Sequence, residues 1–199
     1  MTMCDLSKTA LILIGFQNDY FSPQGVLYDV VEESSRVTGV VKNTLSLLTH
    51  CAEKFALVIN TPIHFTQNYS ELKNPIGILK SIADAGAFKS GSYGAQTIDQ
   101  LYQFKHVIDE IPGKRGLNAF THTHLAQTLK NNNVSEIVLA GTVTSICIDS
   151  TARSAVDLGF DVTILSDCTS SRTPFEQTFY CEEVFPLYAR VISSNIFTK

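Results

Sequence analysis

Residues 136–165 read EIVLAGTVTSICIDSTARSAVDLGFDVTIL, and this stretch decides the fold. Residues 136–140 form an apolar run that is typical of a buried strand, and residues 161–165 form a second run of this kind. Between them the pattern predicts a helix over about 145–158, closed by Gly159, a residue that commonly ends helices. A strand, a helix and a strand in this order predict a right-handed crossover between two parallel strands.

The same alternation extends toward both ends of the chain. Apolar runs predict four further strands, over residues 9–14, 55–60, 106–109 and 190–193. Helical spacing and capping residues predict helices that begin near Val37 (capped by Ser34 or Ser35), after Thr121 and after Thr173. We therefore expect a three-layer α/β/α fold with a mostly parallel, doubly wound sheet of about six strands.

Length and composition are those of one globular domain over residues 1–199. Residues 61–96 are rich in proline and glycine without a sustained period, so we expect a functional loop or a contact surface there. The net charge of −4 gives no reason to expect a nucleic-acid partner, which would need clustered lysine and arginine.

The cysteines and the N-terminal residues bear on the cellular compartment. Five scattered cysteines without a CxxC pair argue against a disulfide framework and against a zinc knuckle, and favour a reducing cytoplasm. The first residues lack the basic segment of a signal peptide, and the apolar runs are far shorter than the ~18–20 residues of a membrane span. We expect a cytoplasmic protein without a membrane partner.

Two residues could carry chemistry at the carboxyl ends of the strands, where sheets of this kind bind ligands. Cys147 falls in the first turn of a predicted helix, whose dipole stabilises a thiolate. Lys114 follows the strand at 106–109 and so reaches the same edge of the sheet. By position alone, the simpler interpretation is that Cys147 is a small buried apolar residue and Lys114 a solvated loop lysine.

Three segments carry a more specific pattern. Residues 141–147 (GTVTSIC), followed by STARSA, look like a Gly-x-x-Thr-x-x-Cys turn before a Thr-Ala-rich helix. Residues 114–120 (KRGLNAF) look like Lys-Arg-x-x-x-x-Phe, and residues 9–20 (TALILIGFQNDY) look like a strand followed by Asp-x-Gln-Asn-Asp-Phe. In this order over residues 9–193, they resemble the isochorismatase-like cysteine hydrolases, a family that includes nicotinamidases and N-carbamoylsarcosine amidases.

The resemblance implies a mechanism and a set of partners. It makes Cys147 the nucleophile that forms a thioester while cleaving an amide-like C–N bond of a small molecule, with Lys114 holding the thiolate. The amides of Val143 and Cys147 would stabilise the oxyanion, next to a cis Thr142–Val143 peptide. The resemblance implies no cofactor, and assembly into a homodimer or homotetramer.

One departure from the family is at Gly15, where the family has its catalytic aspartate. In the family that acid takes the thiol proton and returns it to the departing amine. A lysine ammonium cannot accept this proton, and loss of a general acid–base typically slows a reaction by ~10²–10⁴-fold. Asp19 could substitute, although a loop-ordering acceptor is the simpler interpretation. Isochorismatase activity itself is not expected, because it relies on the missing acid as proton donor.

Further candidates lie at the same edge. We expect Phe16, His64 and Asp19 to contact substrate, although His64 could equally be an ordinary loop histidine. No metal is expected, because the Asp-x-His pair of the metal-binding nicotinamidases is missing and the pair at 122 and 124 has i, i+2 spacing. Two alternatives to an amidase stay open: a catalytically silent member that binds a small molecule or partner, and a protein whose thiol forms adducts or oxidises reversibly.

Overall fold

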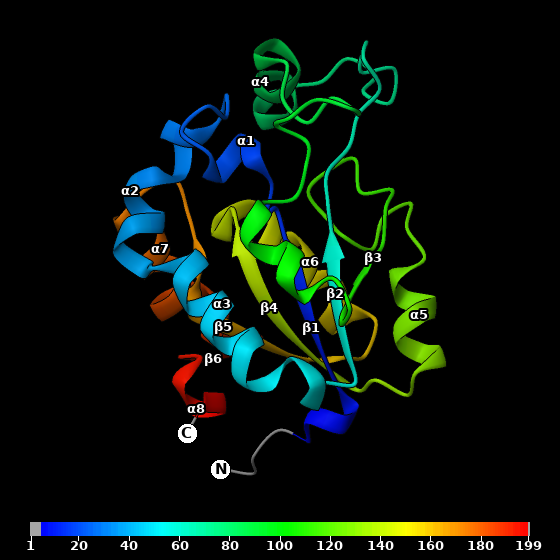
Figure 1. The fold of residues 1–199 in the computed structure, drawn as a ribbon, viewed down its shortest axis with the longest axis vertical. Helices are drawn as coiled ribbons and strands as arrows, with labels where there is room; N and C mark the ends of the chain where they lie inside the picture. The colour runs from blue at the N-terminus through cyan, green and yellow to red at the C-terminus, as the bar shows by residue number, and fades with distance from the viewer. Residues whose placement is uncertain (1–4, 199) are drawn as a thin grey trace.

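The computed structural model describes residues 5–198 and contains a six-stranded sheet between two layers of helices (Figure 1). The strand order is β3-β2-β1-β4-β5-β6, and every neighbouring pair is parallel. The expected three-layer, doubly wound α/β fold is therefore confirmed. The strands are β1 (Thr9–Ile14), β2 (Leu57–Thr61), β3 (Ile108–Glu110), β4 (Glu136–Thr142), β5 (Asp161–Ser170) and β6 (Arg190–Ile192).

Helices connect the strands and cover both faces of the sheet (Figure 1). None of the helices within residues 5–198 has both the length and the apolar character that crossing a membrane would need. The α-helices are α1 (Asn18–Phe21), α2 (Tyr28–Thr38), α3 (Val40–Cys51), α4 (Gly77–Ala85), α5 (Leu125–Asn131), α6 (Asp149–Asp157), α7 (Pro174–Phe179) and α8 (Asn195–Thr198). Two π-helical turns are η4 (Thr144–Ile148) and η5 (Tyr180–Val184); the 3-10 turns are η1 (Leu6–Lys8), η2 (Ala52–Lys54), η3 (Asp99–Phe104) and η6 (Phe185–Leu187).

The central strand β1 is buried along its whole length because helices cover both of its faces. Leu11 and Leu13 pack into a core formed with α3 and η3. Ile12 and Ile14 point to the opposite face and pack into a core formed with α5 and α6. This double burial explains why the sequence of the strand is a continuous apolar run.

The connections change direction between β1 and β4, which are neighbours in the sheet. Ile14 lies opposite Gly141 in this pairing, so the residues that follow the two strands are also neighbours. In doubly wound sheets the ligand site lies at such a switch point. In Figure 1, α1 and α4 lie above the arrowheads of the strands, at this end of the sheet.

Several predicted boundaries were wrong. Ser34 and Ser35 do not cap a helix, because both lie inside α2, which the sequence did not predict. Gly39 separates α2 from α3 in a left-handed conformation (φ +69°), and its N–H bonds to the Ser35 carbonyl. Thr121 is not a cap either, since α5 begins after His124. Residues 61–96 contain α4 as well as loops.

The cap at Thr173 is confirmed. Its hydroxyl accepts a hydrogen bond from the Glu176 amide, and Pro174 occupies the first turn of α7.

Candidate active site

Cys147 and Lys114 meet at the carboxyl end of the sheet. The Lys114 ammonium donates a hydrogen bond to Cys147 Sγ at 3.5 Å, and the two residues are 0% and 4% exposed. The Lys114 backbone is held by an isolated parallel bridge to Ile63 and by a hydrogen bond from His64 N at 3.3 Å. The extension of β2 therefore brings Lys114 from the loop after β3 to the end of β4.

The Lys114 ammonium has few polar partners. Its ammonium also donates to the Gly116 carbonyl. Within residues 5–198, no carboxylate oxygen lies within the 4.0 Å of an ion pair with it. A buried ammonium is strongly unfavourable unless an anion or several acceptors offset it. The adjacent sulfur, as a thiolate, is the group placed to provide that charge.

The turn that carries Cys147 is wider than predicted. The sequence predicts an α-helix from about residue 145, but Thr144–Ile148 form a π-helical turn, and α6 follows it. The Ile148 amide bonds to the Val143 carbonyl at 3.2 Å, five residues back. The Thr142–Val143 peptide is cis, and both residues are buried. Single π-turns occur frequently at functional sites.

Gly15, at the position of the family aspartate, has a backbone conformation that disfavours a side chain. Its φ is +72°, in the left-handed region. A Cβ added there would lie 2.6 Å from the Thr142 carbonyl oxygen and 3.5 Å from Cε2 of Tyr20. An aspartate at this position would therefore be strained, and the ring of Tyr20 already contacts the space it would enter.

Tyr20 is a residue of this site that the sequence analysis did not single out. It lies in α1, is 2% exposed, and belongs to the same apolar cluster as Val143 and Cys147. Its ring also packs against Phe88, with ring centroids 5.1 Å apart. The available signal was the tyrosine in GFQNDY, at a position where the family motif has phenylalanine.

Asp19 is buried, and its carboxylate accepts hydrogen bonds from backbone amides of neighbouring loops. Its Oδ2 accepts a hydrogen bond from Phe88 N at 2.7 Å, and its Oδ1 accepts one from Val26 N at 3.4 Å. Gly94 packs so tightly here that a Cβ on it would lie 2.0 Å from Asp19 Oδ1. This geometry favours the loop-ordering interpretation over that of a replacement acid.

His64 and Phe16 lie apart from the contact between Lys114 and Cys147. His64 Nε2 is 3.1 Å from the Ala95 carbonyl, and the side chain lines a cavity of about 310 Å³ with Asn60 and Thr97. Neither Cys147 nor Lys114 lines this cavity. Phe16 is 1% exposed and belongs to the core on the other face of the sheet from Cys147, stacked on Phe21. Their roles in substrate binding stay predictions.

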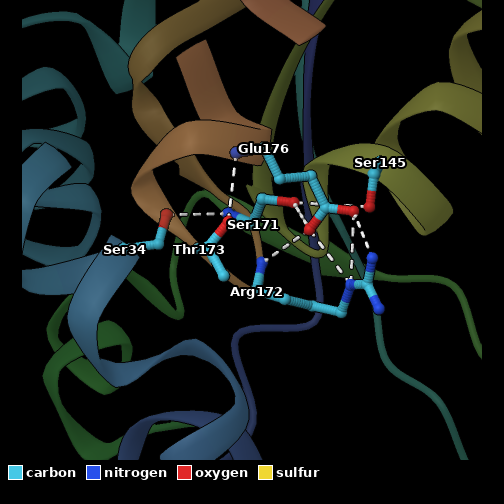
Figure 2. Close-up of polar contacts among 6 residues, drawn as sticks. All are labelled: Ser34, Ser145, Ser171, Arg172, Thr173 and Glu176. Carbon is cyan, nitrogen blue, oxygen red and sulfur yellow. Dashed lines mark hydrogen bonds and ion pairs between the residues drawn. The ribbon is translucent and has the colours of Figure 1, made fainter. Parts of the chain in front are cut away.

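A carboxylate held by several hydrogen bonds also supports this turn (Figure 2). Glu176, in α7, pairs with Arg172 at 2.7 Å and accepts hydrogen bonds from Ser171 and from Ser145 of the π-turn. Partial burial alone would raise the pKa of Glu176, but the hydrogen bonds from Arg172, Ser171 and Ser145 lower it to about 2. A carboxylate of such low basicity positions Ser145 and is a poor proton acceptor.

Comparisons with known proteins agree with the fold and with the family resemblance. Residues 9–196 match the Isochorismatase domain family model. Nicotinamidase 3 of Arabidopsis thaliana is 24% identical over 162 residues, covering 81% of this chain and 73% of that protein. An uncharacterised isochorismatase family protein of Bacillus subtilis, YddQ, is 26% identical and covers 96% and 99%. The crystal structure of a cysteine hydrolase from Pseudomonas syringae superimposes with a TM-score of 0.81 at 18% identity, covering 96% and 91%.

Proposed function

Because the chain belongs to the isochorismatase family of hydrolases, we propose that it cleaves an amide-like C–N bond of a small molecule through a thioester on Cys147. The observation that carries this proposal is the hydrogen bond between the Lys114 ammonium and Cys147 Sγ, with both groups buried. A cation held against a sulfur stabilises the thiolate, which is the nucleophilic form of cysteine.

The proposed reaction needs no base to start it. The Cys147 thiolate attacks the carbonyl carbon, the amides of Val143 and Cys147 stabilise the oxyanion, and the C–N bond breaks as the nitrogen takes a proton. Water then attacks the thioester, which releases a carboxylic acid and regenerates the thiolate. The residues implied by the family require no cofactor for these steps.

Turnover is expected to be slow. The family acid is absent at Gly15, and the two oxygens of Asp19 are engaged by backbone amides. Loss of general acid–base help lowers rates by ~10²–10⁴-fold. Hydrolysis of a vinyl ether, as in isochorismatase, is not proposed, because it relies on that acid.

The experiment is a hydrolysis assay on a panel of small amides that includes nicotinamide, combined with intact-mass detection of an acyl-enzyme. Cys147→Ala and Cys147→Ser should abolish both signals, whereas Cys181→Ala should leave them unchanged. Wild-type turnover that survives Cys147→Ala would overturn the proposal.

A second candidate function is supported by the same absence of an acid at Gly15. In this case the chain binds a small molecule or forms adducts on Cys147 without turning over. The assay separates the two, because adducts formed by an electrophile would persist in the mass spectrum and no amine would be released.

We further propose a cytoplasmic homodimer or homotetramer without nucleic-acid or membrane partners. Phe175 and Leu187 support self-association, since each is a large apolar residue about 80% exposed. Light scattering after size-exclusion chromatography measures the assembly, and a monomer at micromolar concentration would contradict it.

A further inference from the structure

Tyr20 has a hydroxyl without a partner in the described chain, on the small part of the side chain that solvent reaches. Its side chain is 2% exposed, and its hydroxyl forms no hydrogen bond with any of residues 5–198. The hydroxyl of a largely buried tyrosine usually finds a hydrogen-bond partner, so one that is accessible and has none in the chain is free to bond to a molecule in the site. A bound molecule could supply the partner that the chain does not.

The position of the ring indicates where such a molecule would be. Cε2 is bonded to the carbon that carries the hydroxyl, and it lies 3.5 Å from the place of a Cβ on Gly15. Tyr20 also belongs to one apolar cluster with Ile14, Val143 and Cys147. The hydroxyl end of the ring is therefore at the point from which the family aspartate would project.

The electrostatic surroundings keep this hydroxyl protonated. Burial raises the pKa of Tyr20 well above its usual value, and the charges of Cys147 and Asp19 raise it further. A hydroxyl of this kind donates protons and hydrogen bonds near neutral pH, and it does not act as a base there.

We propose that Tyr20 is a further catalytic residue, whose hydroxyl gives the departing nitrogen its proton where family enzymes use the aspartate. This inference rests on the function proposed for Cys147. The sequence differs from the family motif in a reciprocal way: the carboxyl is lost at Gly15 and a hydroxyl is gained at Tyr20.

In this reaction Tyr20 first gives a proton and later takes one back, whereas the family aspartate first takes a proton and later gives it. The thiolate attacks the carbonyl carbon, the C–N bond breaks, and the nitrogen takes the proton of Tyr20, which leaves a phenolate. A nitrogen expelled from an amide is far more basic than a phenolate, so the transfer is favourable. The phenolate then takes a proton from the water that attacks the thioester. The products are an amine, a carboxylic acid, the thiolate and the restored tyrosine.

The test is a comparison of two leaving groups in Tyr20→Phe. An aryl ester such as p-nitrophenyl acetate releases a stable phenolate and needs no proton, whereas an amide needs one. We expect Tyr20→Phe to slow amide cleavage by about 10²-fold, the lower range for general acid help, and to change the burst of nitrophenolate by less than about threefold. Tyr93→Phe, which removes an exposed hydroxyl bonded to Ser22, is the matched control and should change neither.

Equal effects of Tyr20→Phe on amide and ester would overturn the inference, as would no effect on either. Failure of the proposed function looks different, because the wild type would then lack Cys147-dependent cleavage of both substrates. In that case the inference about Tyr20 falls with the function on which it rests.

Discussion

Two cysteines of this chain lie in π-helical turns, and their neighbours differ in charge. Cys147 lies in η4, beside the Lys114 ammonium. Cys181 lies in η5, accepts a hydrogen bond from the Gln177 amide at 3.3 Å, and is followed by Glu182. Burial, followed by the charge of Glu182, raises the pKa of Cys181 to about 11. The comparison teaches that a π-turn does not by itself favour a thiolate, because burial and a nearby carboxylate raise the pKa of Cys181; we expect the Lys114 ammonium to make Cys147 the more reactive thiol.

Helix α7 links the two turns. Gln177 accepts a hydrogen bond from Thr144 of η4 at 2.5 Å and donates to Cys181 of η5. Glu176, the preceding residue, bonds to Ser145 of η4 (Figure 2). The two thiols therefore share one scaffold, so a difference in their chemistry can be assigned to their own neighbours.

The largest expected effect is the ratio of alkylation rates. A thiol with a pKa near 11 is ionised to about one part in 10⁴ at pH 7, so Cys147 should be labelled at least ~10²-fold faster than Cys181. The rate of Cys181 should rise about tenfold per pH unit up to pH 11. Peptide mass mapping after limiting iodoacetamide measures both, and preferential labelling of Cys51, Cys168 or Cys181 would contradict the comparison.

Lys114→Met should remove most of that difference. Without the ammonium, alkylation of Cys147 should slow by about 10–10²-fold at neutral pH. The free energy of unfolding should not fall, because an apolar side chain of similar length replaces a buried cation that has no carboxylate partner. Lys105→Met, at an exposed position, is the control. An unchanged Cys147 rate would show that Lys114 does not activate the sulfur.

Glu176→Gln should weaken the scaffold that the two turns share. The pKa of Glu176 is lowered from 4.5 to about 2 in the fold, so its stabilisation is present above about pH 4.5 and is lost as the pH falls toward 2. We expect the mutant to be less stable by about 1–2 kcal/mol near pH 7, since the Arg172 partner is half exposed. Urea unfolding of wild type, mutant and an exposed control, Glu183→Gln, measures this. A gap between wild type and mutant that persists below pH 2 would contradict the assignment.

The smallest expected effect concerns Glu182. Removing its charge in Glu182→Gln should raise the alkylation rate of Cys181 by only about two- to fivefold, because burial is the larger cause of the raised pKa and solvent screens an exposed carboxylate. The increase should shrink at high salt. A larger increase would mean that charge, and not burial, sets the reactivity of this thiol.

The sequence predicted the central strands of the sheet well because β1, β2 and β4 are covered on both faces and so read as apolar runs. It predicted the meeting of Lys114 and Cys147 because both follow parallel strands, whose carboxyl ends share one edge. The family motif predicted where Gly15 stands. These are local or topological signals, and the structure agrees with them.

The features that were missed depend on contacts across the fold. Sequence places Phe16 and His64 at the correct edge but does not say to which side of the sheet each points. The approach of Tyr20 to Gly15 needs the path of α1, and the π-turn at Cys147 depends on how η4 meets α7. Ser34 and Ser35 were mistaken for the caps of α3. The true boundary is at Gly39, whose left-handed conformation separates α2 from α3 and is not evident from the sequence pattern.

The conformation of Gly15 also limits the routes by which this chain could change over generations. A single substitution to aspartate would have to force a left-handed backbone into strain while its Cβ meets the Thr142 carbonyl. An aspartate at this position therefore needs accompanying changes at residues that do not themselves gain from the acid. While position 15 is a glycine, an acid for the reaction has to come from another side chain.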